Sequence, residues 1–237
     1  MRKAVLLLVA MTLAAGFVPP VAAAVQTEAG STREVRVEVG LSNIPAHGMY
    51  VVGQAYETTT LAVQQGSRLD PRGRTETFFY VVYWNDRYVA TGPDTLRQTG
   101  SFMGEWKAPV DAFVIDRDLG SATLDAVVRP GSCIGSPCDP RHIEAVWTAT
   151  EPSEVALSHW SGWYQLGAGG DWIDVRPSED PDFRYTTNGR TERRPATAEV
   201  SVNATPVPAT TFLDRSELWR RHETQSWTCF TDRCPFD

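Results

Sequence analysis

Short runs of β-branched and aromatic residues, separated by turn-forming residues, recur along almost the whole chain. Residues 34–39 alternate strictly between charged side chains and valine, a pattern typical of a strand with one buried face. Residues 78–84 are apolar on both faces, and their aromatic and β-branched content predicts a central strand. Together the runs predict an all-β fold, an antiparallel β-sandwich or barrel of about ten short strands.

Turn residues and a capping pattern define several local predictions. The four residues after Leu166 are Gly-Ala-Gly-Gly, which predicts a hairpin between residues 160–166 and 171–175. Asn188-Gly189 is the strongest short hairpin signal in the chain. Residues 214–223 allow two interpretations, a short C-terminal helix opened by a capping box at its start, or a last strand.

The first residues of the chain have the pattern of a secretory signal peptide. Arg2 and Lys3 precede an apolar stretch from Ala4 to Val18, which is shorter than a membrane-spanning helix requires, and small residues follow two prolines. We predict a signal peptide over 1–24, a disordered segment over 25–33 and a single β-sandwich domain over 34–237. An uncleaved anchor is the alternative.

Composition indicates the compartment and excludes some partners. The chain carries a net charge of −7, which repels nucleic acid and anionic lipid, so we expect no nucleic-acid partner. No second apolar run is long enough to span a membrane, so we expect a secreted mature form without a membrane span. Among the 22 basic residues only Lys3 and Lys107 are lysine, a bias that favours a bacterial source with a GC-rich genome.

The four cysteines form two pairs with the same spacing, Cys133 with Cys138 and Cys229 with Cys234. An even number of cysteines in an exported chain favours disulfides, and the turn residues between Cys133 and Cys138 favour local pairing. Four cysteines allow three connectivities. We predict the two local pairings, which close two short loops, over a pairing between the two cysteine pairs. A four-cysteine zinc site is the alternative.

A cluster of aromatic residues is the best candidate for a ligand site. On alternating strands Trp160 and Tyr164 share a face and Trp163 takes the other, while Trp172 lies on the second strand of the predicted hairpin beside Asp174. At least one large aromatic side chain must then point away from the core. An exposed tryptophan can stack on a sugar ring, and carboxylates beside it can accept hydrogen bonds from the sugar hydroxyl groups. The alternative is that another sheet or loop covers this face.

Other chemistry has weaker support in the sequence. The acidic residues between Asp171 and Asp182 offer oxygen ligands for calcium, but they lack the spacing of an EF-hand, and a solvated acidic loop is the preferred interpretation. No G-x-S-x-G motif is present, and no motif supports a catalytic role for any of the four histidines. We predict no catalytic residue, no metal site and no cofactor.

These observations leave three hypotheses for function. The first is an exported, non-enzymatic β-sandwich that binds a partner or belongs to the cell envelope. The second is a carbohydrate-binding or carbohydrate-active protein that uses the aromatic hairpin. The third is a secreted hydrolase without a recognisable motif. The partner is accordingly an unidentified protein or a glycan.

Overall fold

The computed structural model describes residues 26–45, 49–106, 110–135, 137–208, 211–212 and 216–233. These residues form strands and one 3-10 turn, η1 (Val110–Ala112). The strands are β1 (Gln26–Ser42), β2 (Ala55–Leu69), β3 (Thr75–Gly92), β4 (Thr95–Trp106), β5 (Phe113–Ile115), β6 (Ser121–Val128), β7 (Pro130–Ile134), β8 (Arg141–Ala149), β9 (Glu154–Leu166), β10 (Trp172–Val175), β11 (Phe183–Val202), β12 (Thr205–Pro206), β13 (Thr211–Phe212) and β14 (Glu217–Cys229).

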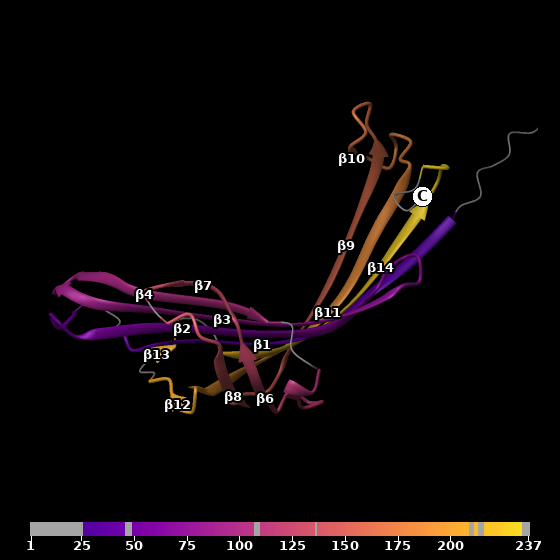
Figure 1. Ribbon diagram of the computed structural model, residues 1–237. Coiled ribbons are helices and arrows are strands. Elements are labelled where there is room, and N and C mark those ends of the chain that lie inside the picture. The colour runs from indigo at the N-terminus through magenta and orange to yellow at the C-terminus, as the bar shows by residue number, and fades with distance from the viewer. Residues whose placement is uncertain are drawn as a thin grey trace, which may run out of the picture.

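All strand pairs are antiparallel, and the main path through the sheet runs β5-β6-β8-β11-β14-β1-β2-β3-β4-β7. The path folds over so that β6 and β8 form a small layer beneath the long strands β1 to β4 (Figure 1). The sheet stays open rather than closing on itself. The predicted all-β sandwich is therefore confirmed. The described residues form 14 strands rather than about ten, and β1, β2, β3 and β11 are 15 to 20 residues long rather than short.

The long strand β11 changes its partner part-way along. Its residues 196–202 pair with β8 in the small layer, whereas residues 183–193 pair with β9. We call the two-layered part of the molecule the body. We call the single-layered extension, formed by β9, β10 and the adjoining ends of β11, β14 and β1, the arm (Figure 1). The sheet bends as it leaves the body, so that the arm projects away from the small layer.

The core lies between the two layers of the body. The face of the long strands that packs on β6 and β8 is here the covered face, and the opposite face is the open face. Trp147 of β8 is fully buried in this core and donates a hydrogen bond from Nε1 to the carbonyl oxygen of Glu38 at 3.3 Å. Apolar side chains on the covered face include Val37, Val39, Leu61, Val63, Val81, Tyr83 and Leu218.

The apolar pattern of the covered face stops on four strands close to one level, where the small layer ends. The hydrogen-bonded pairing of β1 with β14 continues well beyond that level, as far as Gln26 opposite Cys229. The last apolar residues are Val35, Val63, Phe79 and Leu218, and the next residues on the same face are Arg33, Gln65, Thr77 and Arg220. The boundary between body and arm is therefore marked by a change from apolar to polar side chains, whereas the backbone ladder of β1 and β14 continues across it.

Two local predictions are wrong, and one of two alternatives left open is decided. Residues 26–33 are not disordered but belong to β1, where they pair with residues 222–229 of β14. Residues 217–229 form β14, so the last-strand interpretation holds and the C-terminal helix does not. Asn188-Gly189 forms no turn, because both residues lie within β11 and pair with β9 on one side and β14 on the other.

The hairpin of residues 160–166 and 171–175 is confirmed, since β9 pairs with β10 from Leu166 opposite Trp172. The Cys133–Cys138 disulfide is confirmed as well, with Cα atoms 5.8 Å apart. Cys229 is buried at the end of β14, whereas Cys234 and the signal peptide lie outside the described residues. The single domain over 34–237 stays a prediction. Within the described ranges no helix has the length and apolar character needed to cross a membrane.

Candidate functional site

A row of aromatic side chains crosses the open face of the arm. Trp160 of β9, Tyr185 of β11 and Trp227 of β14 lie side by side, with ring centroids 5.5 Å apart for the first pair and 5.0 Å apart for the second. The Trp160 residue is 46% exposed, and the other two are partly buried. Figure 1 shows no second layer of described strands over the arm, and the exposure of Trp160 agrees with a row that faces solvent.

Glycines allow the two indoles of this row to lie close to the sheet. A Cβ atom at Gly162 would come within 2.6 Å of the Trp160 ring, so this ring occupies the space above the glycine. A Cβ at Gly30 of β1 would come within 3.3 Å of the Trp227 ring. Each ring therefore lies close to the backbone of a glycine, in space that a larger residue would fill.

A second aromatic group extends the row toward the tip of the arm. Tyr164 stacks on Phe183, with centroids 5.0 Å apart, and Trp172 of β10 meets the same phenylalanine edge-on at 4.8 Å. Asp174 is exposed and lies opposite Tyr164 in the β9/β10 pair. Burial, and to a lesser degree the charge of Asp174, raise the pKa of the Tyr164 hydroxyl.

Trp163 lies on the other face of the arm. Its ring stacks on Phe230 with centroids 5.6 Å apart, and the Arg184 guanidinium lies 5.2 Å from the ring centroid. The structure thus brings Trp160, Tyr164, Trp172 and Asp174 to one face, as the alternation predicts, and separates Trp163 from them.

Polar side chains border the aromatic row on the side toward the body. Glu223 of β14 is buried, accepts a hydrogen bond from Gln225 Nε2 at 2.8 Å and forms an ion pair with Arg221. Burial alone raises the pKa of Glu223, but the hydrogen bonds from Gln225 and Arg221 outweigh it and lower this pKa below its ordinary value. Burial and the charge of Glu223 in turn raise the pKa of Tyr185. The row therefore borders an ionised carboxylate, an amide and a guanidinium group.

The predicted acidic loop has a structural role at one of its positions. Asp182 is buried, and its Oδ2 accepts a hydrogen bond from the backbone amide of Leu166 at 2.8 Å. Its Oδ1 accepts a hydrogen bond from the hydroxyl of Thr231, also at 2.8 Å. Both oxygens thus tie the end of β9 to the segment after β14, and the solvated-loop interpretation is wrong for this residue.

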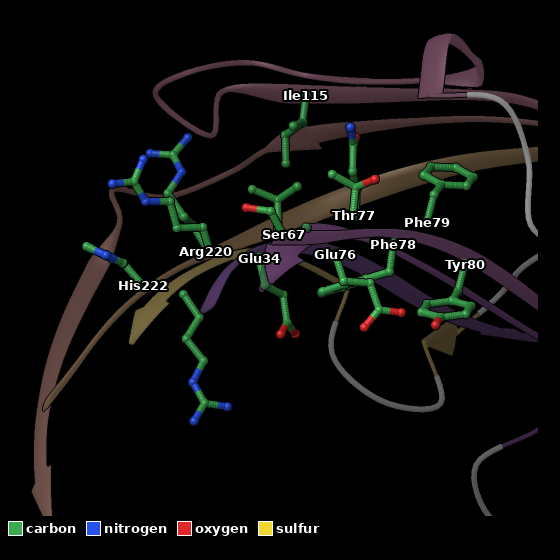
Figure 2. Close-up of a pocket in the computed structure, with 15 residues that line it drawn as sticks. Glu34, Ser67, Glu76, Thr77, Phe78, Phe79, Tyr80, Ile115, Arg220 and His222 are labelled. Atoms are coloured by element: carbon green, nitrogen blue, oxygen red, sulfur yellow. The ribbon is translucent and has the colours of Figure 1, made fainter. Parts of the chain in front are cut away.

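A pocket of about 900 Å³ lies where the arm leaves the body (Figure 2). Thr77 and Phe79 line it from the covered face beneath Ile115, whereas Glu34 and Tyr80 point to the open face. Its lining mixes both signs of charge with aromatic rings. The pocket therefore lies at the end of the core, and its mixed lining does not favour one class of ligand.

A second pocket, of about 910 Å³, opens at the opposite end of the body. The Arg141 guanidinium lies over the Phe102 ring at 3.8 Å from its centroid, and burial raises the pKa of the nearby Tyr83. Asn85 in this wall donates its Nδ2 hydrogen bonds to Thr59 Oγ1 at 2.9 Å and to the Thr58 carbonyl. These polar groups bind one another across the wall, which leaves the arm as the better candidate.

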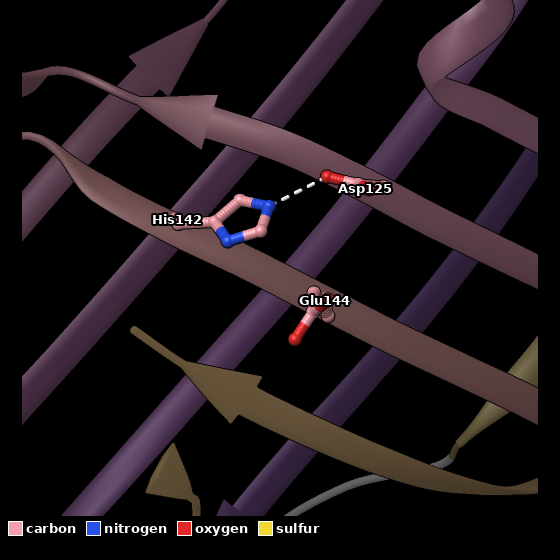
Figure 3. A group of neighbouring side chains, drawn as sticks. All are labelled: Asp125, His142 and Glu144. Atoms are coloured by element: carbon pink, nitrogen blue, oxygen red, sulfur yellow. Dashed lines mark hydrogen bonds and ion pairs between the residues drawn. The ribbon is translucent and has the colours of Figure 1, made fainter. Parts of the chain in front are cut away.

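Three side chains on the outer face of the small layer have the chemistry of metal ligands (Figure 3). Asp125, His142 and Glu144 offer atoms that lie within 4.8 Å of one another. The His142 Nε2 atom is already 2.6 Å from Asp125 Oδ1, and this hydrogen bond raises the pKa of the imidazole. Glu144 accepts a hydrogen bond from the Ser201 hydroxyl at 3.0 Å. We interpret the group as a surface ion pair with a supporting carboxylate.

No family model matches this chain, and neither a curated protein nor a solved structure matches it.

Sequence reasoning missed Tyr185, Trp227 and Glu223. Tyr185 and Trp227 lie in strands that are remote from β9 in sequence, and the pairing of β11 with both β9 and β14 brings them together. A usable signal is present, however. Phe183 and Tyr185 are two positions apart and so share one face of β11. In the same way Trp160, Gly162 and Tyr164 share one face of β9.

Proposed function

We propose that the chain is an exported, non-enzymatic binding protein, and that the open face of its arm binds carbohydrate. The observation that carries this proposal is the row of Trp160, Tyr185 and Trp227, which lies across three strands without a second layer above it. Flat aromatic rings supply apolar surface for one face of a sugar ring, and amphipathic rings such as Trp and Tyr are enriched at binding surfaces.

The polar groups beside the row support the same ligand class. Glu223 accepts, whereas Gln225 and Arg221 donate, so together they match the hydroxyl groups of a sugar. The lowered pKa of Glu223 keeps its carboxylate ionised, which suits an acceptor of hydrogen bonds. A general acid for glycoside hydrolysis needs the opposite shift, so the proposal is one of binding rather than cleavage.

The test is a titration of the mature protein with a panel of soluble polysaccharides, followed by tryptophan fluorescence. We expect a saturable change with one glycan class. Trp160→Ala and Trp227→Ala should each weaken that binding at least about tenfold, which corresponds to about 1.4 kcal/mol.

Trp84→Ala is the matched control. Trp84 lies on the open face of the body and is 48% exposed, close to the 46% of Trp160. It should leave glycan binding unchanged. Equal losses from Trp84→Ala and Trp160→Ala, or no response to any glycan, would remove the arm as a carbohydrate site and favour a protein partner or an envelope role.

A further inference from the structure

Strand β9 has a long free edge. Over Glu154–Gly162 it pairs with β11 on one side, and the other side has no described partner. Strand β10 pairs only with the last part of β9, Trp163 to Leu166. Every residue from Glu154 to Trp160 is exposed. The backbone amide and carbonyl groups along this edge are thus available to another strand.

The other described edges of the sheet are shorter than this one. Thr75–Tyr80 of β3 and Thr95–Gly100 of β4 extend past the strands that pair with the rest of β3 and β4, and each has six residues with a described partner on one side only. Strand β5 has three residues. Strand β7 has five residues, begins at Pro130, shifts register against β4 and is closed by the Cys133–Cys138 disulfide. These are the devices by which monomeric proteins prevent edge-to-edge pairing.

Strand β9 has none of these protections. It is 13 residues long, contains no proline or lysine and has Glu154 as its one acidic or basic residue apart from His159. Its pairing with β11 has no register shift. Leu157 is 79% exposed, the highest value among the large apolar residues of the described chain, and Val155 is 50% exposed. A long, regular and apolar edge of this kind is a template for strand addition.

We propose that two copies of this chain associate through β9, edge to edge and antiparallel, about a two-fold axis at Ser158. The free stretch Glu154–Gly162 is symmetric about this residue, and β10 limits it at one end. Antiparallel pairing of a strand with its own copy gives a self-complementary contact and closes the assembly as a dimer. A second copy also offers the same unprotected edge, so both free edges disappear at once.

The side chains of β9 fit this register. On the open face, Trp160 lies opposite the partner's Ala156, and Ser158 lies opposite the partner's Ser158. On the other face, Leu157 lies opposite the partner's His159. Large side chains thus meet smaller or polar ones, and Glu154 meets the partner's Gly162 rather than a like charge, which would be destabilising. The two aromatic rows then become parts of one continuous face.

This inference does not depend on carbohydrate binding, and its test measures mass. Sedimentation of the mature protein should give twice the mass of one chain. Leu157→Lys places a charge on the free edge and should convert the dimer to a folded monomer with an unchanged circular dichroism spectrum. Val146→Lys, at a 46% exposed position of β8 away from any edge, is the matched control and should remain dimeric.

The register is tested by Ser158→Cys, because only a residue on the axis meets its own copy. Under mild oxidation this variant should form a covalent dimer, whereas Val146→Cys should not. A wild-type protein that stays monomeric at all concentrations overturns the proposal. A dimer that persists in Leu157→Lys, or a dimeric Ser158→Cys protein that does not cross-link, overturns it as well. Glycan binding by a monomer would leave the proposed function intact while removing the dimer.

Discussion

The body and the arm share three of their strands, yet their side chains follow different rules. In the body, β6 and β8 alternate between buried and exposed residues along their length. In the arm, β9 is exposed at every residue from Glu154 to Trp160. Over Asp125–Val128, β6 also has a described partner on one side only, and it still alternates there, so one-sided pairing does not create the difference. The difference arises because a second layer covers one face of the strands in the body and no described strand does so in the arm.

The arm covers its backbone in another way. On the open face of the arm, Trp160 lies over Gly162 and Trp227 lies over Gly30, and at the junction with the body Phe78 lies over Gly66. Neighbouring rings also contact one another, and such aromatic pairs contribute about 0.5–1.5 kcal/mol beyond the area they bury. A sheet without a second layer can thus use its own aromatic side chains as a thin substitute for one.

The largest effect expected from this difference is on the stability of two matched isoleucine variants. Ile143→Ala in β8 removes a fully buried side chain from the core, and we expect a loss of about 2–5 kcal/mol. Ile173→Ala in β10 removes a side chain that is 48% exposed, and we expect a change within about 0.5 kcal/mol. Urea unfolding measures both. Equal losses would mean that the arm is packed as tightly as the body.

A smaller effect is expected at the junction between the two regions. A Cβ at Gly66 would come within 2.4 Å of the Arg33 carbonyl oxygen and 2.6 Å of the Phe78 ring. The backbone must then shift, and we expect Gly66→Ala to cost about 1–3 kcal/mol. Gly131→Ala in β7 is the control, because its nearest neighbour is 3.6 Å away. A neutral Gly66→Ala would show that the junction is loosely packed.

The smallest effect is a dependence on pH that belongs to the arm. The pKa of Glu223 is lowered in the folded protein, so its contribution to stability is complete above its ordinary value of 4.5 and is lost as pH falls through the lower folded value. Glu223→Gln should reduce stability at pH 7 by about 1 kcal/mol, the scale of one hydrogen bond. Urea unfolding below pH 4.5 should show this gap closing. A gap that stays constant with pH would contradict the assigned hydrogen bonds.

The alternation of residues 34–39 was enough to predict a half-buried strand, but not where that strand begins. Valine gives way to Arg33 and Ser31 on the same face, and this change was interpreted as disorder. In the structure the change marks the end of the small layer, while the backbone ladder with β14 continues. The pattern of apolar side chains shows where a second layer covers a strand. Pairing through main-chain hydrogen bonds requires no particular side chains, so the sequence does not show how far a strand continues.

The same limit explains the error at Asn188-Gly189. A two-residue hairpin turn needs a positive φ at both central residues, and neither residue has one here. Flanking strands pair with β11 on both sides of this position, and Ser158 lies against Gly189. The tertiary pairing therefore overrides a strong local signal. The aromatic cluster at residues 160–172 could be found because its members are close in sequence, whereas Tyr185 and Trp227 join it only through that pairing.

The continuity of β1, β11 and β14 from body to arm also has a mechanical consequence. A load on the tip of the arm, directed along the strands, is shared by many main-chain hydrogen bonds of the β1/β14 and β11/β14 ladders at once. Those bonds must then fail together, in shear. A sideways load on β9 acts on a single ladder, bond after bond, because over Glu154–Gly162 this strand is held by β11 alone within the described chain. The arm is thus strong under tension along its axis and weak against peeling at its edge.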